Sequence, residues 1–485
     1  MIRCPKQFAL SVLLITFLPV PSSAKATPDT AWTFLTGGAV YSSPTYDNGS
    51  IYIGSDDHNL YSLNAASGAM SWKFETGGIV RCKAAIANAS VYVASDDGYL
   101  YALDAASGSK NWKCHIGNNI NRVLPNATTF TGNYWDYMQS SPCVESGVVY
   151  VGSGDSCVYA VDAQNGGLRW KTRTGGIVRS SPCVYDGIVY VGSWDGFIYA
   201  LNITNGSQVW AFDTHGNPYK NVQPSPRAVD SVVYCGGRNP YFYAIHAKTG
   251  ILLWKHSFES SWVESSAAIA NGIVYVGSSD LNQVHAFDAK TGTAVWTGSV
   301  PGNTWSSPFY DNGTLYIGLA SYKSTMTASA GGGLLALDAS NGHIQWSVDC
   351  GSSPFIGGVV SSPIVEDNLV YYGSLDGKVY AVKKVVTTVK ERKETDHVPG
   401  EYGLENYPNP FNPSTKIRFS LPHSGRVNLS IFDLLGRIVA ELMNTEMSAG
   451  THEVVFDARA LSTGVDLSVL RTGTVTKGAK LVYSK

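Results

Sequence analysis

Short runs in which apolar and polar residues alternate recur along most of this chain, and most of them end in a tryptophan. The segment "YVGSWDGFIYALNITNGSQVW" (190–210) has close copies that end at Trp72, Trp112 and Trp170. Alternation with β-branched and aromatic side chains predicts half-buried strands. Aspartate–glycine pairs between the runs predict tight hairpins. The pattern therefore indicates many short antiparallel strands rather than helices.

Each repeat predicts four strands, which the first unit shows as Ser42–Tyr46, Ile51–Ser55, Leu60–Asn64 and Met70–Phe74. Seven complete units lie between the tryptophans that close them, and an eighth begins at Val360 without a tryptophan strand of its own. The closing tryptophans are Trp32, Trp72, Trp112, Trp170, Trp210, Trp254, Trp296 and Trp346. Four-stranded units of this length are typical of a β-propeller. We expect the strand of Trp32 to complete the eighth unit and close the ring.

We therefore predict an all-β protein: an eight-bladed β-propeller with an N-terminal strand in its last blade, then a small immunoglobulin-like β-sandwich. The expected domains are a signal peptide (1–26), the propeller (27–386), a linker (387–403) and the sandwich (404–485). Charged residues make up only 15% of the 485, with 50 glycines and 28 tyrosines. This composition suits strands and turns.

The N-terminus has the pattern of an export signal, with Arg3 and Lys6 before an apolar run and a small-x-small cleavage site at 24–26. That run is too short to span a membrane, and we expect no later span. The net charge of −2 offers no basic surface, so we do not expect a nucleic-acid partner. Seven cysteines follow the cleavage site, an odd number that leaves at least one unpaired.

The pattern D-A-x-[ST]-G-x-x-x-W, present at Asp104–Trp112 and Asp288–Trp296, resembles the repeat of pyrroloquinoline quinone (PQQ) propellers over residues 31–386. That family includes quinoprotein alcohol dehydrogenases and a non-catalytic lipoprotein of outer-membrane assembly. The resemblance to the enzymes implies an adjacent cysteine pair, often a CxxCH haem motif, and calcium ligands. The sequence has neither cysteine motif, and its asparagines and aspartates fall mostly at turns. We expect no catalytic residues, metal or cofactor, with PQQ and calcium as the alternative.

The C-terminal segment contains "YPNPFNP" (407–413), "DLLGR" (433–437) and "AGTH" (449–452). These motifs resemble the type A sorting domain of the type IX secretion system over residues 404–485. The resemblance implies export to the periplasm, passage through the outer membrane with the type IX machinery as a partner, and a secreted or cell-surface location.

The long connections are expected to gather on one face, around the mouth of the central channel. Residues that precede each Ser-Ser-Pro-like motif should form a ring there, and the tryptophans outside the repeat fall on the same face. The ring is Tyr41, Arg81, Gln139, Arg179, Gln223, Glu264, Trp305 and Val360, and the tryptophans are Trp135, Trp194, Trp262 and Trp305. Two interpretations stand: an aromatic lid that seals the channel, or a binding surface.

The expected function is that of a secreted, non-catalytic propeller that binds a cell-surface or extracellular protein or glycan. The alternative is a quinoprotein-like oxidoreductase or a carbohydrate-active propeller enzyme.

Overall fold

The computed structural model describes residues 28–117, 136, 138–214, 220–259, 261–322, 332–350, 356–384 and 401–483, the last range without 408, 412–413, 435, 459–463 and 474. Contacts between Cα atoms divide the chain into two compact units, Ala26–Val385 and one that contains Val386–Lys485. Every regular element of the described residues is a β-strand. No helix in that part of the chain is long and apolar enough to cross a membrane.

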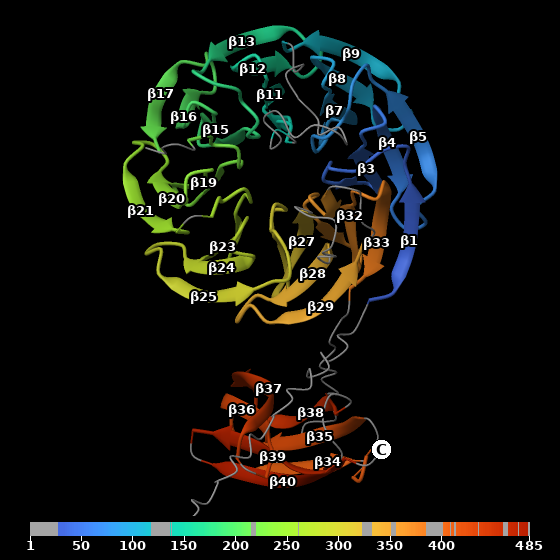
Figure 1. Ribbon diagram of the computed structural model, residues 1–485, viewed down its shortest axis with the longest axis vertical. Coiled ribbons are helices and arrows are strands. Elements are labelled where there is room, and N and C mark those ends of the chain that lie inside the picture. Colours follow the sequence, from blue (N-terminus) through green and yellow to red (C-terminus); the bar gives the residue numbers. More distant parts are fainter. Residues whose placement is uncertain are drawn as a thin grey trace, which may run out of the picture. The chain divides into compact units, whose positions relative to one another are not determined.

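Eight antiparallel sheets, or blades, surround a common axis in the first unit (Figure 1). Each blade runs outward from strand A through B and C to strand D. Blades 1 to 4 consist of β2 (Thr45–Asp47), β3 (Ser50–Gly54), β4 (Asn59–Asn64), β5 (Met70–Glu75); β6 (Ala85–Ala87), β7 (Ser90–Ala94), β8 (Tyr99–Asp104), β9 (Lys110–His115); β10 (Cys143–Glu145), β11 (Val148–Gly152), β12 (Cys157–Asp162), β13 (Leu168–Arg173); β14 (Cys183–Tyr185), β15 (Ile188–Gly192), β16 (Phe197–Asn202) and β17 (Gln208–Asp213).

Blades 5 to 8 consist of β18 (Arg227–Val229), β19 (Val232–Gly236), β20 (Tyr241–His246), β21 (Leu252–Ser257); β22 (Ala268–Ala270), β23 (Ile273–Ser278), β24 (Gln283–Asp288), β25 (Ala294–Ser299); β26 (Phe309–Asp311), β27 (Thr314–Tyr322), β28 (Gly333–Asp338), β29 (Ile344–Asp349); β31 (Ile364–Glu366), β32 (Leu369–Gly373), β33 (Lys378–Lys383) and β1 (Thr30–Leu35).

The first and last strands of the propeller lie side by side. β1 pairs antiparallel with β33, with Phe34 opposite Val379. The N-terminal strand therefore supplies strand D of blade 8, and the predicted eight-bladed ring with this closure is confirmed. Closure leaves no unpaired outer strand at the junction of the two ends.

Strand A is shorter than the sequence predicts. In blade 1 it begins at Thr45 rather than Ser42. Residues before it bond to the neighbouring blade instead of their own sheet, since the Ser42 hydroxyl donates to the Cys82 carbonyl at 2.7 Å. Hydrogen bonds to the neighbouring blade therefore replace the first backbone hydrogen bonds that strand A would make to strand B. The other predicted strands of this unit agree to within one residue.

The recurring tryptophan holds the seams between blades. The Trp32 indole N–H donates to the Ala65 carbonyl at 2.8 Å, across the seam to the C–D turn of blade 1. The turn passes directly over the ring: a Cβ placed on Gly68, whose φ is +73°, would lie 2.6 Å from it. Glycine is required there by both the close approach and the left-handed backbone. These tryptophans pack between blades, as predicted.

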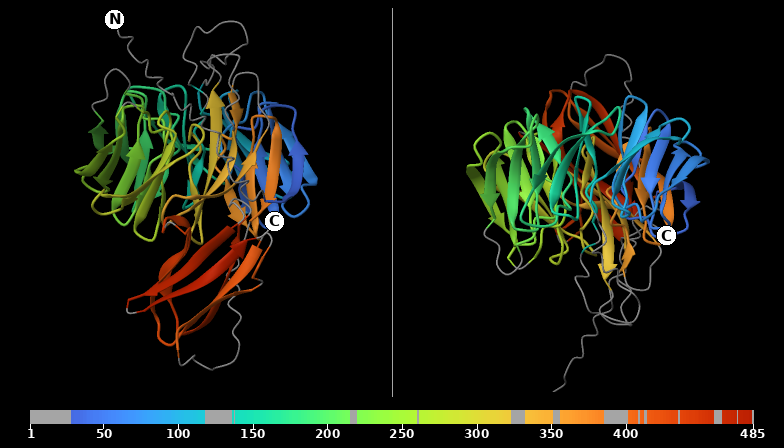
Figure 2. Two further views of the ribbon diagram at one scale, coloured as in Figure 1. Left: turned by 60° about the horizontal axis from the view of Figure 1, so that its bottom comes forward. Right: turned by 90° about the horizontal axis from the view of Figure 1, so that it is seen from above.

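The strands of each blade run between the two ends of the propeller (Figure 2). We call the end with the D–A connections and B–C turns the mouth face, and the end with the A–B and C–D turns the opposite face. On the mouth face of blade 7, β27 extends beyond its hairpin to pair with β30 (Ile356–Gly358), with Ala320 opposite Gly358. The long B–C connection of blade 7 therefore starts as a strand.

The C-terminal unit is a sandwich of two antiparallel sheets. Its buried core includes Phe411, Ile417, Leu429, Phe456 and Leu470. One sheet has the order β34–β35–β38 and the other β37–β36–β39–β40, from β34 (Gly403–Tyr407), β35 (Ser414–Leu421), β36 (Gly425–Phe432), β37 (Ile438–Met447), β38 (Gly450–Asp457), β39 (Gly464–Thr472) and β40 (Thr476–Tyr483).

Deletion of residues 27–36 should destabilise the propeller by several kcal/mol. It removes a whole outer strand and the buried Trp32 indole, and loss of a buried tryptophan alone costs about 3–5 kcal/mol. The measurement is chemical denaturation of the deleted and parent chains. Truncation after residue 400 is the control, because it removes a separate compact unit and should leave the propeller transition unchanged. Equal stability of the parent and the N-terminal deletion would contradict ring closure by β1.

Candidate functional site

Two positions of each blade that lie on the mouth face vary from blade to blade. The first is the predicted ring from Tyr41 to Val360, which we call the mouth ring. The second follows the small residues that end strand B, and we call it the second ring: Asp56, Asp96, Gly154, Trp194, Arg238, Ser279, Ala320 and Leu375. In four places a side chain of the mouth ring bonds to the second-ring side chain of the preceding blade. The pairs are Arg81 with Asp56, Gln139 with Asp96, Glu264 with Arg238, and Trp305 with Ser279.

Charged and amide side chains form this contact between blades 1, 2 and 3. Arg81 makes a two-pronged ion pair with Asp56, with Nε–Oδ1 at 2.7 Å and Nη2–Oδ2 at 2.6 Å. Burial lowers the pKa of Arg81, but the hydrogen bonds and charge of Asp56 raise it further, with a net increase. Gln139 accepts from the Arg81 backbone N–H at 2.9 Å and donates to Asp96 at 3.1 Å. The arginine therefore stays charged beneath the surface.

Arg179 has glycine, Gly154, as its expected partner in the second ring. It pairs instead with Asp136, at the end of the long insertion, through two contacts of 2.7 Å. Both side chains are almost completely buried, at 1% and 4% exposed. Asp136 thus replaces the missing carboxylate of the second ring.

Arg238 organises the aromatic part of the mouth. Its Nε donates to Glu264 Oε1 at 2.6 Å, and its guanidinium carbon lies 5.3 Å from the centre of the Trp194 ring and 5.2 Å from that of Trp262. Cation–π contacts of this kind favour a positive charge between two indoles. Both tryptophans are half-buried. Two predicted tryptophans are therefore brought together by an arginine that the sequence did not single out.

Unpaired polar atoms occur on several residues of blades 4 to 6 at the mouth, where this arginine lies. Among the described residues, the buried atoms without a hydrogen-bond partner include Trp194 Nε1, both amide atoms of Gln223, Asn239 Oδ1 and Glu264 Oε2. Desolvation raises the pKa of Glu264, although Arg238 acts in the opposite direction. Buried polar groups are normally paired, so such a group of unpaired atoms indicates a place where water or a ligand binds. We call Trp194, Gln223, Arg238, Trp262 and Glu264 the Arg238 cluster.

The rest of the mouth ring is apolar. Trp305 is 3% exposed and packs with Ala320, Val360 and Leu375, while Tyr41 and Met138 contact the same cluster. Its indole N–H donates to Ser279 Oγ at 2.7 Å. Trp305 is therefore buried, whereas Trp194 and Trp262 are partly accessible. Trp135 lies outside the described residues.

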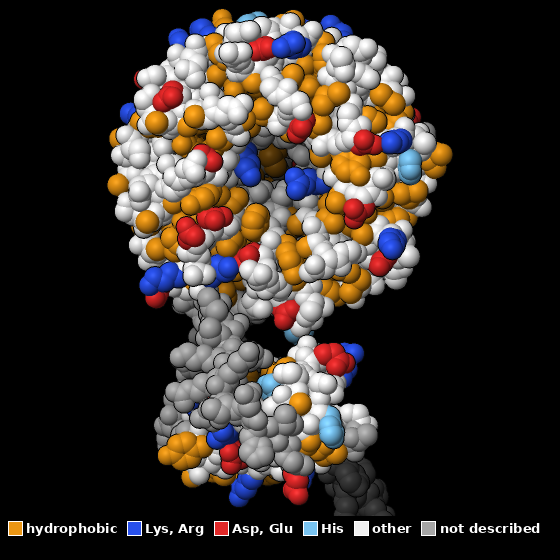
Figure 3. Space-filling model, turned by 180° about the vertical axis from the view of Figure 1, so that it is seen from behind, with side chains coloured by type: hydrophobic (Ala, Val, Ile, Leu, Met, Phe, Trp, Pro, Cys, Tyr) orange, Lys and Arg blue, Asp and Glu red, His pale blue; other side chains and the backbone are white. Residues whose placement is uncertain are grey.

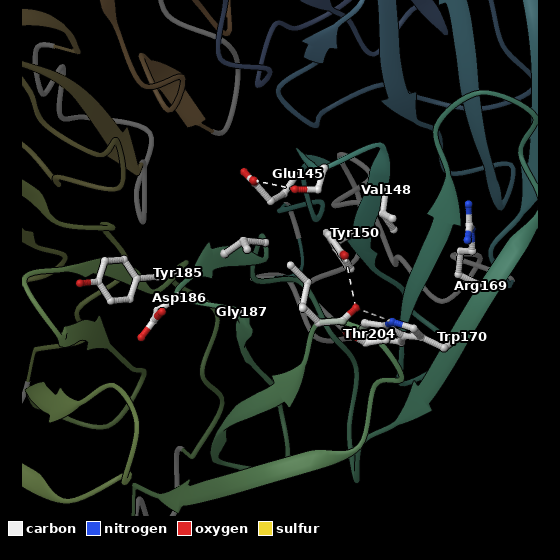
Figure 4. A pocket seen from close by; sticks show the side chains of 12 residues that line it. Glu145, Val148, Tyr150, Arg169, Trp170, Tyr185, Asp186, Gly187 and Thr204 are labelled. Atoms are coloured by element: carbon white, nitrogen blue, oxygen red, sulfur yellow. Dashed lines mark hydrogen bonds between the residues drawn. The ribbon is translucent and has the colours of Figure 1, made fainter.

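A pocket of about 670 Å³ lies elsewhere, on the opposite face between blades 3 and 4 (Figure 4). Its wall contains Trp170 and Tyr150, which both donate to the Ile203 carbonyl, at 3.0 and 3.4 Å. The same tryptophan–carbonyl bond recurs at other seams, as at Trp32. The repeated seam accounts for the contacts of Trp170 and Tyr150, and we place the candidate site at the mouth.

A family model described as "Outer membrane protein assembly factor BamB", built on PQQ repeats, matches residues 22–130, 129–261 and 238–386, three quarters of the chain. The chain belongs to this PQQ-repeat propeller family. A second model, the secretion system C-terminal sorting domain, matches residues 405–484. The resemblances to PQQ-repeat propellers and to the sorting domain are therefore confirmed. The chain carries a sorting domain that directs it to secretion or the cell surface.

Solved structures support the same fold. BamB from Moraxella catarrhalis is 16% identical, with a TM-score of 0.56, and the match covers 74% of this chain and 100% of that one. A quinohemoprotein alcohol dehydrogenase from Pseudomonas putida HK5 is 15% identical, with a TM-score of 0.56 and coverage of 78% and 79%. The computationally designed protein Ika8 is 15% identical, with a TM-score of 0.58 and coverage of 72% and 97%. No curated protein matches the chain.

Removal of Arg179 should destabilise the propeller strongly, because it leaves the buried Asp136 carboxylate without its ion-pair partner. We expect Arg179→Ala to cost about 3–5 kcal/mol. The double variant Arg179→Leu/Asp136→Leu should recover much of that loss, since it buries no charge. The control is Lys248→Ala in the exposed pair with Asp186, which should cost less than about 1 kcal/mol. Urea unfolding of the parent chain and the three variants measures the free energy of unfolding. Equal losses of stability in Arg179→Ala and Lys248→Ala would contradict the prediction.

Proposed function

We propose that this protein is a secreted binding protein, without catalytic activity, whose mouth face takes a glycan or extended peptide at or outside the cell surface. The observation that carries the proposal is the Arg238 cluster. It presents indole rings, an unpaired indole N–H, an unpaired amide and an unpaired carboxylate oxygen within one part of the mouth. Sugars and peptides both offer alternating apolar faces and hydrogen-bonding groups that match this set.

Glycan is the ligand that the cluster favours. A sugar ring can lie on an indole while its hydroxyls both donate and accept, and Gln223 offers one atom of each kind. Glu264 Oε2 adds an acceptor and Trp194 Nε1 a donor. A peptide would have to satisfy the same atoms mainly with its backbone.

The turn aspartates, which a calcium-dependent enzyme would need as ligands or base, have structural partners in several blades. Asp97 Oδ2 accepts from the Tyr101 hydroxyl at 2.5 Å and from the Gly77 N–H at 2.8 Å. Asp57 and Asp195 accept the equivalent bonds. These contacts fix the connection that enters each blade. Their recurrence supports a scaffold role for these residues.

Trp262→Ala should weaken glycan binding at least tenfold and change the stability by less than about 1.5 kcal/mol, because this indole is only half-buried. We expect the same for Trp135→Ala, the predicted residue of the longest insertion. The measurement is isothermal titration with soluble oligosaccharides prepared from the cell-surface polysaccharide of the native culture, together with thermal melting.

Trp305→Ala is the matched control: a mouth-ring tryptophan that is buried. It should lower stability by about 3–5 kcal/mol and leave affinity per folded molecule nearly unchanged. Binding of surface-protein peptides but no oligosaccharide would show that the ligand is peptide. The binding proposal is excluded if all three variants lose much stability and the parent chain binds neither oligosaccharide nor peptide. The tryptophans would then act only as an aromatic lid over the channel.

Processing should remove both ends of the precursor. We expect the mature extracellular protein to begin near Lys25 or Thr27 and to lack most of residues 404–485, because the sorting domain acts in passage through the outer membrane. Intact-mass measurement on protein from the culture medium or cell surface tests this. A chain truncated after residue 400 should stay inside the outer membrane. Secreted protein that retains its full C-terminus would contradict removal of the domain.

A further inference from the structure

Serine hydroxyls link the segments that lead into strand A of neighbouring blades. The serine hydroxyl of one blade accepts the backbone N–H of the equivalent residue in the blade before it, at 2.9 to 3.0 Å. The series is Lys83 to Ser141, Ser141 to Ser181, Ser181 to Ser225, Ser225 to Ser266, Ser266 to Ser307, Ser307 to Ser362 and Ser362 to Ser43. These residues therefore form one layer around the axis, which we call the serine layer.

The hydroxyls of this layer keep their hydrogens available. A serine oxygen that accepts one bond can still donate its own O–H. Within the described part of the chain, none of the seven hydroxyls donates to a protein acceptor. The channel therefore carries a set of hydrogen-bond donors at one level.

Two cationic residues replace small or apolar ones in this lining. Lys83 stands where the other seven blades have serine in the serine layer. Arg227 lies two residues after Ser225, at the start of β18, and its charge acts on Lys83. The equivalent residues in the other blades are Thr45, Ala85, Cys143, Cys183, Ala268, Phe309 and Ile364. Both cations are thus particular to this channel and not to the repeat.

These two side chains have no protein counter-ion among the described residues, where no carboxylate lies within 4.0 Å of either. Both are accessible to solvent. Desolvation by the surrounding protein, and then the charge of Arg227, lower the pKa of Lys83. Figure 3 shows a hollow at the centre of the propeller with Lys or Arg side chains on both sides of it. Like charges held together in this way are unfavourable without an anion.

We propose that the channel binds a tetrahedral oxyanion, sulfate or phosphate, between Lys83 and Arg227, with hydroxyls of the serine layer as further donors. Arginine and lysine both suit such a group, and the hydroxyls supply neutral hydrogen bonds around it. The oxyanion is either a free ion or the ester group of a larger ligand. This site uses residues at the start of strand A and just before it, and does not depend on the Arg238 cluster.

The test uses the purified parent chain and two variants that restore residues of other blades. Lys83→Ser completes the serine layer, and Arg227→Thr copies Thr45, so both should fold. We expect sodium sulfate and sodium phosphate to bind the parent chain in isothermal titration against a sodium chloride background. Each variant should weaken this binding at least tenfold. Without anion, Lys83→Ser should melt at a higher temperature than the parent chain, because it removes one of two like charges that repel each other.

Lys73→Ser, at an exposed lysine of β5, is the matched control and should bind as the parent does. A sulfated and a phosphorylated hexose identify the source: tighter binding than the inorganic ion supports an ester group, and weaker binding supports a free ion. The proposal is overturned if the parent binds no oxyanion, or if the Lys83 and Arg227 variants bind as tightly as the parent. Trp262→Ala should leave oxyanion binding intact, so failure of the glycan proposal and of this one are distinguishable.

Discussion

The structure depends on the contact between the closing tryptophan of one blade and the C–D turn of the next. The indole N–H bonds to a turn carbonyl at 2.7 to 3.1 Å in seven seams, from Trp32 to Trp296. One residue type therefore provides both a large apolar contact and a directional bond. Because the contact recurs, it fixes the angle between neighbouring blades, and this angle determines which side chains of the two faces meet.

The eighth seam is different, because the C–D turn of blade 8 is replaced by the two ends of the propeller. Trp346 is nevertheless buried, at 2% exposed. The Lys383 N–H bonds to the Asp29 carbonyl at 2.9 Å and joins the two ends. Pairing of β1 with β33 thus substitutes for a covalent turn. The closing tryptophan is therefore buried also at the junction where the chain is interrupted.

Most of the fold could be predicted from the sequence because one strong pattern is repeated many times. The site could be predicted only in part, for a physical reason. Sequence repetition identifies which positions vary, such as Arg81 and Glu264, but not which variable residues meet across a seam. Asp136 shows this clearly: it replaces a carboxylate that the repeat lacks at Gly154, and only the fold brings it to Arg179. Arg238 was missed because it occupies a turn position, although that position varies as the mouth ring does.

The repeat also explains how one propeller can carry two independent sets of polar residues. The mouth uses the residues on either side of the loops, whereas the channel uses residues at the start of strand A and just before it. Charges in the first set neutralise one another, as in the buried pairs of Arg81 with Asp56 and Arg238 with Glu264. A buried pair is costly to form and more costly to break, so it fixes the geometry of a site more than it stabilises the fold. Lys83 and Arg227 have the opposite character, since they share one sign. The hydrogen bonds of the serine layer join backbone N–H groups to hydroxyls, so they use neither the ammonium group of Lys83 nor the guanidinium group of Arg227.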